Sequence, residues 1–470
     1  MGLKPVRAFD VFIFAGRASR AQRPANPGAR AAWPASLLGL CAFLACIGVA
    51  PRAQAVSLQE VLRQALASHP ALAQRRSEID ASRYDVKSAE WKRFPTLTVE
   101  ASQLLMRPAV TTTNGNLGAQ TVRLDQRLYT FGRIESEIDA ATLRQRGAEW
   151  SFAETEQELM LRVVQAWMEL VRQTERLALA QRNIDEHQRL ADLIRRRLAS
   201  GVSSEDDAAL AEARLAQARA EATVFRAAAQ NARVSLEQLS GAPLAGPADA
   251  PVRPPRLKWV GVDAALQQAT VWSPTLRRLS AGVAQAENEL RARNAAIYPE
   301  VLGRYERFSG SATVAPFDRF MVVLQYQPGA GLSQIPQIDA ARLRAEGAVS
   351  SLEAGKRDLT ERVAAAFNEV QALQEQLEPA RAALRASGDV MESYVRQYTA
   401  GRKTWQEVLN AQRELTQAAY ALADTEAATT GAFLRLDVLT GALSRGVLEG
   451  GRGPAVFAAS ESNNPVNLRP

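Results

Sequence analysis

The chain has 470 residues, of which 47% are hydrophobic and 23% charged, a composition typical of a folded protein with a sizeable core. Its two cysteines are Cys41 and Cys46, and its two histidines are His69 and His187. So few Cys and His side chains exclude a histidine-rich metal cluster and leave almost nothing for a catalytic triad. The sequence also lacks a glycine-rich phosphate loop, so we expect neither an enzyme nor a cofactor.

Most of the positive charge lies in residues 1–55, which hold seven basic side chains and one acidic side chain. They carry most of the formal net charge of +7 and leave about +1 for the rest of the chain. The basic character therefore gives no reason to expect a nucleic-acid partner.

The same segment has the pattern of a signal peptide. Basic residues precede an apolar run, residues 37–50, that is shorter than the roughly 20 residues of a spanning helix. An A-x-A site follows at residues 53–55, so we expect export and cleavage after Ala55. Two alternatives stay open, a retained anchor and lipidation of Cys46, because the residues before that cysteine resemble an imperfect lipobox.

The rest of the chain reads as two copies of one unit. Four residues of the first copy, Leu58, Leu62, Pro70 and Pro95, align without a gap with Val262, Leu266, Pro274 and Pro299. Further on, residues 138–141 recur at 338–341, and Gly201 aligns with Gly401. We therefore divide the chain into a signal peptide (1–55), repeat 1 (56–255), repeat 2 (256–445) and a Gly- and Asn-rich tail (446–470) expected to be disordered.

Each copy predicts the same elements in the same order: a helix, an apolar hairpin, a very long helix, a glycine turn and a shorter helix. In repeat 1 the hairpin is expected at about 96–131, the long helix at about 133–200, the turn at 201 and the shorter helix at about 204–240. In repeat 2 the corresponding ranges are about 300–328, about 335–400, 401 and about 404–441. A bend is expected in the second long helix at Pro379.

Side chains alternate in both hairpins. Apolar Leu97 and Val99 flank Thr98, and Val122 and Leu124 flank Arg123. An ordinary hairpin with one wet face would show the same pattern. Export and strand lengths of roughly ten residues favour transmembrane strands, which must close into a barrel. Since four strands cannot close a pore, we infer oligomerisation, with twelve strands in a trimer as the hypothesis.

The long helices follow a heptad pattern. An apolar or small residue recurs every seven positions, at Val163, Leu170, Leu177, Ile184, Ala191 and Leu198, and again at Val363, Val370, Leu377, Leu384, Met391 and Tyr398. A heptad kept over this many turns predicts a supercoiled helical seam. The first helix would be about 65 residues, or roughly 100 Å, long.

Together these features resemble the TolC family of outer-membrane channels over roughly residues 57–445. Residues 57–70 resemble the family's N-terminal signature, and residues 401–412 resemble its helical-turn motif. Within the family, the chain is most similar to outer-membrane components of type I systems that secrete cyclolysin.

The resemblance implies a membrane α+β fold: a trimeric 12-stranded outer-membrane β-barrel, four strands per protomer, continued by a long coiled-coil α-helical barrel in the periplasm. It implies a homotrimer in outer-membrane lipid that works with a periplasmic adaptor (a membrane fusion protein) and an inner-membrane ABC transporter. The Gly201 and Gly401 turns would form the periplasmic end, where the adaptor docks.

The resemblance also implies a gate at that end. The positions that match the family's latch are Asp207, Tyr398 and Lys403, where lysine replaces the usual arginine and would hold the closed state less firmly. The positions that match its ring of carboxylates are Glu407 and Asn410, which predicts reduced cation selectivity. Tyr398 could equally be a core side chain at a heptad position, and Glu407 an ordinary solvated residue.

Two functions fit this fold, and the fold does not separate them. The first is a passive exit duct of a type I secretion system for a protein toxin of the cyclolysin (RTX) type. The second is the outer-membrane channel of a tripartite pump for drugs or metals. A soluble periplasmic coiled-coil adaptor is the alternative of another class, and would need no amphipathic strands.

Overall fold

The computed structural model describes residues 56–103, 118–244, 246–247, 259–309, 315–327 and 329–444. Every helix and strand lies in one compact unit that begins at Ala53. The predicted signal peptide, its two cysteines, most of the first hairpin loop and the predicted disordered tail lie outside the described residues. Among the helices that are described, none has an apolar stretch long enough to cross a membrane.

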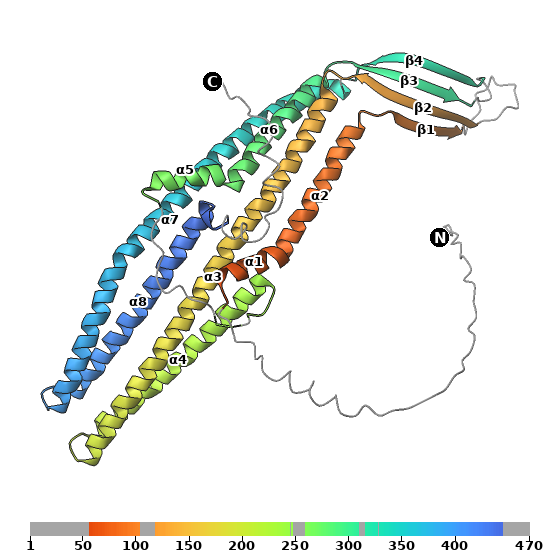
Figure 1. Cartoon of the computed structure of the whole chain (residues 1–470). Helices are drawn as coiled ribbons and strands as arrows, with labels where there is room; N and C mark the ends of the chain where they lie inside the picture. Colours follow the sequence, from red (N-terminus) through yellow and green to blue (C-terminus); the bar gives the residue numbers. More distant parts are fainter. Residues whose placement is uncertain are drawn as a thin grey trace, which may run out of the picture. The chain divides into compact units, whose positions relative to one another are not determined.

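The same series of elements occurs twice along the chain (Figure 1). The first series is α1 (Leu58–Ser68), α2 (Pro70–Trp91), β1 (Thr96–Gln103), β2 (Gly118–Tyr129), α3 (Arg133–Ala199) and α4 (Glu205–Ser240). The second is α5 (Val262–Trp272), α6 (Pro274–Ala295), β3 (Glu300–Phe308), β4 (Phe317–Gln325), the short 3-10 turn η1 (Ala330–Leu332), α7 (Gln334–Thr399) and α8 (Trp405–Leu439).

The opening segment of each series is two helices, where the sequence predicted one. The breaks fall at His69 and Ser273, each followed by a proline at the first position of the next helix. Proline lacks the amide hydrogen that a continuing helix needs but fits the first turn of a new one. Both breaks are capped: His69 Nδ1 accepts from Ala71 N at 3.2 Å, and Ser273 Oγ accepts from Leu276 N at 3.3 Å.

The two long helices are continuous. α3 has 67 residues and α7 has 66, and α7 keeps its helical assignment through Pro379. Several of the heptad positions are fully covered, among them Val163, Leu170, Ala191, Val363, Val370, Met391 and Tyr398. The periodic apolar side chains therefore face neighbouring helices: α3 packs against α2, α4, α6 and α8, and α7 packs against α6 and α8.

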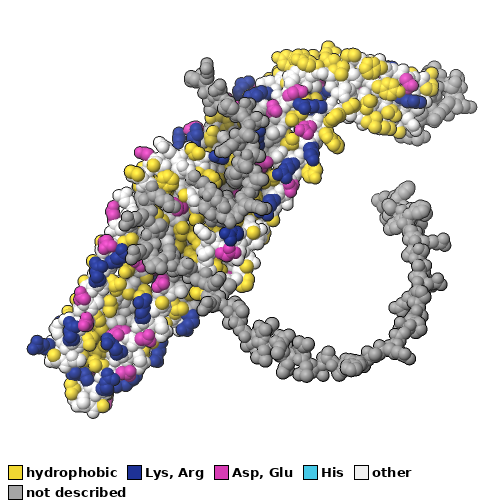
Figure 2. Space-filling model, viewed as in Figure 1, with side chains coloured by type: hydrophobic (Ala, Val, Ile, Leu, Met, Phe, Trp, Pro, Cys, Tyr) yellow, Lys and Arg dark blue, Asp and Glu magenta, His cyan; other side chains and the backbone are white. Residues whose placement is uncertain are grey.

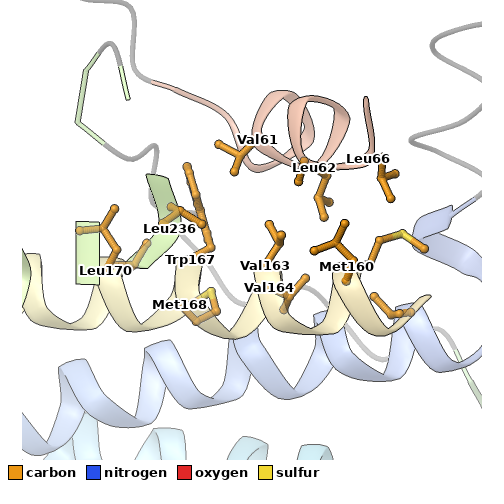
Figure 3. Close-up of a cluster of buried hydrophobic side chains, with 14 of the residues drawn as sticks. Val61, Leu62, Leu66, Met160, Val163, Val164, Trp167, Met168, Leu170 and Leu236 are labelled. Carbon is orange, nitrogen blue, oxygen red and sulfur yellow. The ribbon is translucent and has the colours of Figure 1, made fainter. Parts of the chain in front are cut away.

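The largest apolar cluster joins the first helix of the chain to the middle of α3 and the end of α4 (Figure 3). Trp167 of α3 is its biggest side chain and is 1% exposed, with Val163 and Leu62 at 0%. Burying side chains of this size stabilises the fold by about 1.5–3 kcal/mol each. This cluster fixes α1 and α4 on opposite sides of one stretch of α3.

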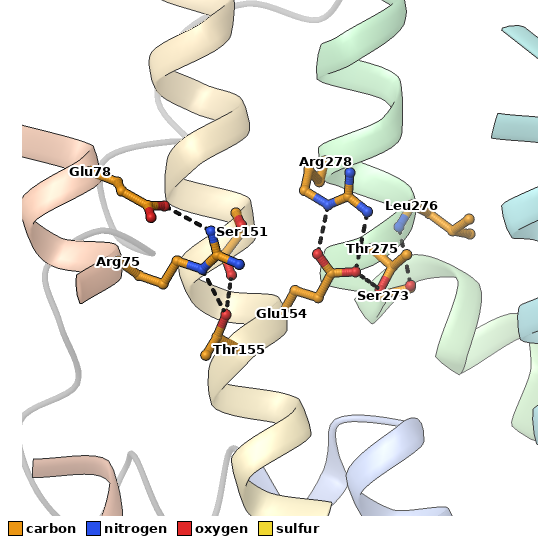
Figure 4. Close-up of polar contacts among 9 residues, drawn as sticks. All are labelled: Arg75, Glu78, Ser151, Glu154, Thr155, Ser273, Thr275, Leu276 and Arg278. Carbon is orange, nitrogen blue, oxygen red and sulfur yellow. Dashed lines mark hydrogen bonds and ion pairs between the residues drawn. The ribbon is translucent and has the colours of Figure 1, made fainter. Parts of the chain in front are cut away.

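Polar contacts hold the same helix to both repeats a little further towards the strands (Figure 4). On one side, Arg75 of α2 donates to Thr155 of α3 at 3.2 Å. On the other, Glu154 of α3 accepts from Arg278 of α6 at 2.6 Å and from Thr275 at 2.9 Å. α3 is thus tied to the opening helices of both copies.

The strands form one antiparallel sheet in the order β1-β2-β3-β4, so that strands of both copies share a sheet. Residues of one face stand opposite each other across the sheet, as in the row formed by Leu97, Leu124, Tyr305 and Phe320. Within the described residues, β1 and β4 each have one edge without a partner strand. The sheet can therefore extend on both sides.

The two faces of the sheet differ sharply. One face carries apolar side chains that are largely exposed, including Leu97, Val99, Leu124, Tyr305, Phe320, Val322 and Leu324 (Figure 2). The other face carries ion pairs between strands: Arg304 donates to Asp125 at 2.6 Å, and Arg319 donates to Glu306 at 2.7 Å. The alternation predicted from the sequence is thus present in all four strands.

Candidate functional site

The Gly201 and Gly401 turns, with the helix ends that flank them, form the candidate site. Both glycines have a left-handed backbone, with φ of 74° and 73°. This conformation is common after a helix C-terminus and favours glycine, which has no Cβ. In each turn the next residue closes the same loop: Val202 N donates to Arg197 O, and Arg402 N donates to Gln397 O, both at 2.8 Å.

Each turn leads into a helix that begins with a capping hydroxyl. Ser204 Oγ accepts from Asp207 N at 3.1 Å, and Thr404 Oγ1 accepts from Glu407 N at 3.4 Å. At Thr404 the cap is reciprocal, because Glu407 Oε2 accepts from the Thr404 amide at 2.9 Å. Reciprocal capping of this kind satisfies two of the free amides of a helix N-terminus.

Lys403 and Glu407 form a close ion pair at the start of α8. Lys403 Nζ donates to Glu407 Oε1 at 2.6 Å and lies 4.4 Å from the centre of the Tyr394 ring. The Lys403 hydrogen bond, together with those from Thr404, lowers the pKa of Glu407 to about 2. The same hydrogen bond raises the pKa of Lys403. Both groups are therefore charged across the whole physiological pH range.

Tyr398 connects the two turns. Its ring is 7% exposed and lies 5.5 Å from the Trp405 ring. Its hydroxyl is 3.2 Å from Ser203 Oγ in the other turn, within hydrogen-bond distance. The Arg197 guanidinium, at the end of α3, stands 4.9 Å from the centre of the same ring. Tyr398 is thus both a core side chain and a polar link between the two helix pairs.

An apolar cluster lies directly behind these polar contacts. It combines side chains of α3, α4, α7 and α8, namely Leu190, Ala191, Ile194, Ala211, Met391, Tyr398, Trp405, Val408, Leu409 and Ala411. All four helix ends therefore pack as one unit. Slightly further from the turns, Asn183 Oδ1 of α3 accepts from Gln412 Nε2 at 3.1 Å and from Thr416 Oγ1 at 2.9 Å, both on α8.

The structure brings only some of the predicted site residues together. Lys403 pairs with Glu407, which the sequence analysis placed in the ring and not in the latch. Asp207 has no printed-range side-chain partner among the described residues, and its backbone amide is occupied by the Ser204 cap. Asn410 is exposed one turn beyond Glu407. The glycines of both turns are exposed.

Sequence reasoning missed three residues of this site, Ser203, Arg197 and Trp405. Each contacts Tyr398, and none matches a position that the family resemblance singled out. A signal was present for Trp405, a large aromatic residue directly after a glycine turn. No local pattern marked Ser203 or Arg197, because their contact with Tyr398 joins segments that are far apart in the sequence.

A family model described as outer membrane efflux protein matches residues 61–242 and 265–442 of the chain. The chain belongs to the outer membrane efflux protein family. The two matched segments correspond to the two series of helices and strands, and the family resemblance predicted from the sequence is confirmed.

Among curated proteins, Protein CyaE of Bordetella pertussis is similar to this family member, with 28% identity over 287 residues. The match spans 57% of this chain and 58% of the length of CyaE. Two solved structures share the fold. The outer-membrane channel OprN superposes with a TM-score of 0.73 at 21% identity and covers 82% of this chain and 89% of its own.

The second is the outer membrane protein VceC from Vibrio cholerae, with a TM-score of 0.71 at 18% identity over 82% of this chain and 96% of its own. The fold of this efflux-family chain is therefore that of TolC-type outer-membrane channels. Within the residues that the structure describes, no cluster of three or more His, Cys, Asp or Glu side chains is arranged to hold a metal ion.

Proposed function

We propose that this chain is one protomer of a homotrimeric exit duct in the outer membrane. The observation that carries the proposal is the four-stranded sheet, which has an exposed apolar face, a charged face and two unpaired edges. A sheet with these properties is stable in lipid only when its edges are closed. Three copies supply twelve strands, with the apolar face towards lipid and the ion pairs towards a polar lumen.

The helices would continue the duct into the periplasm. α3 has 67 residues, or roughly 100 Å at 1.5 Å per residue, which approaches the depth of that compartment. The Gly201 and Gly401 turns would then form the periplasmic end and dock a periplasmic adaptor. The chain has no nucleotide-binding motif, so an inner-membrane ABC transporter would supply the energy.

Secretion of a protein is the finer proposal. The support is the similarity to CyaE together with the sequence resemblance to duct components of type I systems. The substrate would be a toxin of the cyclolysin (RTX) type. The family description, outer membrane efflux protein, favours a second candidate, the channel of a tripartite drug or metal pump. The exposed apolar sheet argues against a soluble adaptor, which would leave this surface in water.

The gate is proposed at the two turns. Tyr398 bridges them through Ser203 and Arg197, so that separating the α7–α8 pair from the α3–α4 pair must break this contact. Asp207 and Lys403 remain candidates for contacts between neighbouring protomers. Glu407 and Asn410 remain candidates for the ring that lines the narrow end.

The test of the duct is conductance of the purified protein in a planar bilayer, combined with chemical cross-linking in detergent. Trimers that conduct weakly, and conduct more when Tyr398 is replaced by Phe, support both the duct and the gate. Well-folded protein that never conducts overturns the duct. A Tyr84→Phe variant is the control, because Tyr84 is 69% exposed on α2 and touches neither turn.

Secretion and efflux are separated in cells that lack their own exit ducts. The chain is expressed with the adaptor and ABC transporter of an RTX-toxin system, or with those of a drug pump. Toxin in the medium without restored drug resistance supports secretion. Restored resistance without toxin export overturns it in favour of efflux.

A further inference from the structure

The Lys403–Glu407 ion pair changes the charge that the periplasmic end can present. All acceptor atoms of the carboxylate are occupied within one protomer: Oε1 accepts from Lys403 Nζ at 2.6 Å, and Oε2 accepts from the Thr404 amide at 2.9 Å and from Thr404 Oγ1 at 3.0 Å. The carboxylate is therefore held in one place, with a cation beside it.

We propose that Lys403 determines the ion selectivity of the duct, because it neutralises Glu407 and leaves the narrow end with three ion pairs in place of three free carboxylates. The inference rests on the proposed trimeric duct. A ring of carboxylates favours passage of cations, whereas a ring of compact ion pairs has almost no net charge and selects weakly.

Three features make the neutralisation permanent. The lysine is anchored on two sides, by Glu407 and by the Tyr394 ring 4.4 Å away. The carboxylate is also part of the helix cap, so a change of partner would free amides of the first turn. The side chains are only 25% and 39% exposed, which limits exchange with ions from solution.

The neighbouring positions add no carboxylate that would restore the charge. Asn410, one turn further along α8, is neutral and exposed. The residue between the glycine and Lys403 is Arg402, which is exposed and carries a further positive charge. The start of α8 is therefore neutral to positive, and only removal of Lys403 uncovers the negative charge of Glu407.

The experiment measures the reversal potential of single channels in a tenfold gradient of potassium chloride. The wild type is expected to reverse close to zero. Lys403→Gln frees three carboxylates per trimer and is expected to raise the K⁺ to Cl⁻ permeability ratio several-fold. Glu407→Gln leaves three lysines and is expected to shift the ratio towards Cl⁻. The double variant is expected to return to the wild-type ratio.

A matched control uses the same pair elsewhere on α7. Lys356 Nζ donates to Glu353 Oε1 at 2.7 Å, far along the helix from the Gly401 turn, and Lys356→Gln removes the same charge there. It is expected to leave the reversal potential unchanged. Conducting trimers whose permeability ratio does not respond to Lys403→Gln overturn the inference and leave the duct intact. A wild type that never conducts overturns the duct itself and this inference with it.

Discussion

The α3–α4 turn and the α7–α8 turn have almost the same backbone and opposite chemistry. Both place glycine at φ near 74°, close the loop with the same hydrogen bond at 2.8 Å, and start the next helix with a hydroxyl cap. The first turn is followed by three consecutive acids, residues 205–207, and the second contains Arg402 and Lys403. Turn geometry is thus fixed by glycine and the cap, and the remaining positions are free to diverge.

The divergence has a consequence for the protomer. The acids of the first turn stand at the N-terminus of α4, where the helix dipole favours negative charge. In the second turn the same need is met by Glu407 alone, which also neutralises Lys403. The only polar bridge between the described parts of the turns is Tyr398 with Ser203 and Arg197.

The strongest way to break the comparison is to remove that bridge. Tyr398→Ala deletes a nearly buried ring from the shared cluster, and we expect it to destabilise the two turns by about 3–5 kcal/mol. Tyr398→Phe loses only the hydroxyl contact and should cost about 1 kcal/mol. Hydrogen exchange of the amides at the helix ends measures both. Equal effects of the two variants would show that the ring contributes nothing.

The shared geometry is tested at the glycines. Gly201→Ala and Gly401→Ala should each cost about 1–2 kcal/mol, because an added Cβ is disfavoured in the left-handed region. The two costs should agree, since neither added Cβ would meet another atom within 4 Å. Gly147→Ala, in the middle of α3 and equally unobstructed, should instead stabilise by about 0.5–1 kcal/mol. Unequal costs at the turns, from the same exchange measurement, would contradict a common backbone.

The caps should distinguish the turns by a smaller amount. Ser204→Ala removes one hydrogen bond and should cost about 1 kcal/mol. Thr404→Ala also removes the hydroxyl that donates to Glu407 Oε2 at 3.0 Å, so we expect a cost towards 2 kcal/mol. Exchange rates of the first-turn amides of α4 and α8 report each cap separately. A larger loss at Ser204 would reverse the assignment of the stronger cap.

The sequence predicted those parts of the structure that depend on local patterns. Heptads and the absence of proline placed the helix that became α3, and glycine placed both turns. Alternation placed the strands, although the pairing of β2 with β3 joins the two repeats and had no local signal. The contact of Tyr398 with Ser203 depends on how two helix pairs rotate against each other, which no single segment records.

The partner of Lys403 shows the same limit at the scale of one side chain. The family resemblance assigned it to a latch and Glu407 to a ring, whereas the helix geometry places the two four residues apart on one face. Spacing alone permits this pair but does not choose it over an acid of the other turn. The choice depends on the reciprocal cap, which orients the carboxylate.

Titration of the carboxyl groups gives the smallest and most local effect. Carbon-detected NMR should find a pKa of about 2 for Glu407, where Lys403 and Thr404 stabilise the charged form, and about 7 for Glu156 of α3, where burial disfavours it. Since the pKa of Glu407 lies below its ordinary value of 4.5, its stabilising effect is complete above that value and is lost as the pH falls through about 2. Lys403→Gln should raise the pKa of Glu407 and leave that of Glu156 unchanged. A Glu407 that titrates near 4.5 in the wild type would mean that the ion pair does not persist in solution, and the α7–α8 turn would then present a free carboxylate like those of the α3–α4 turn.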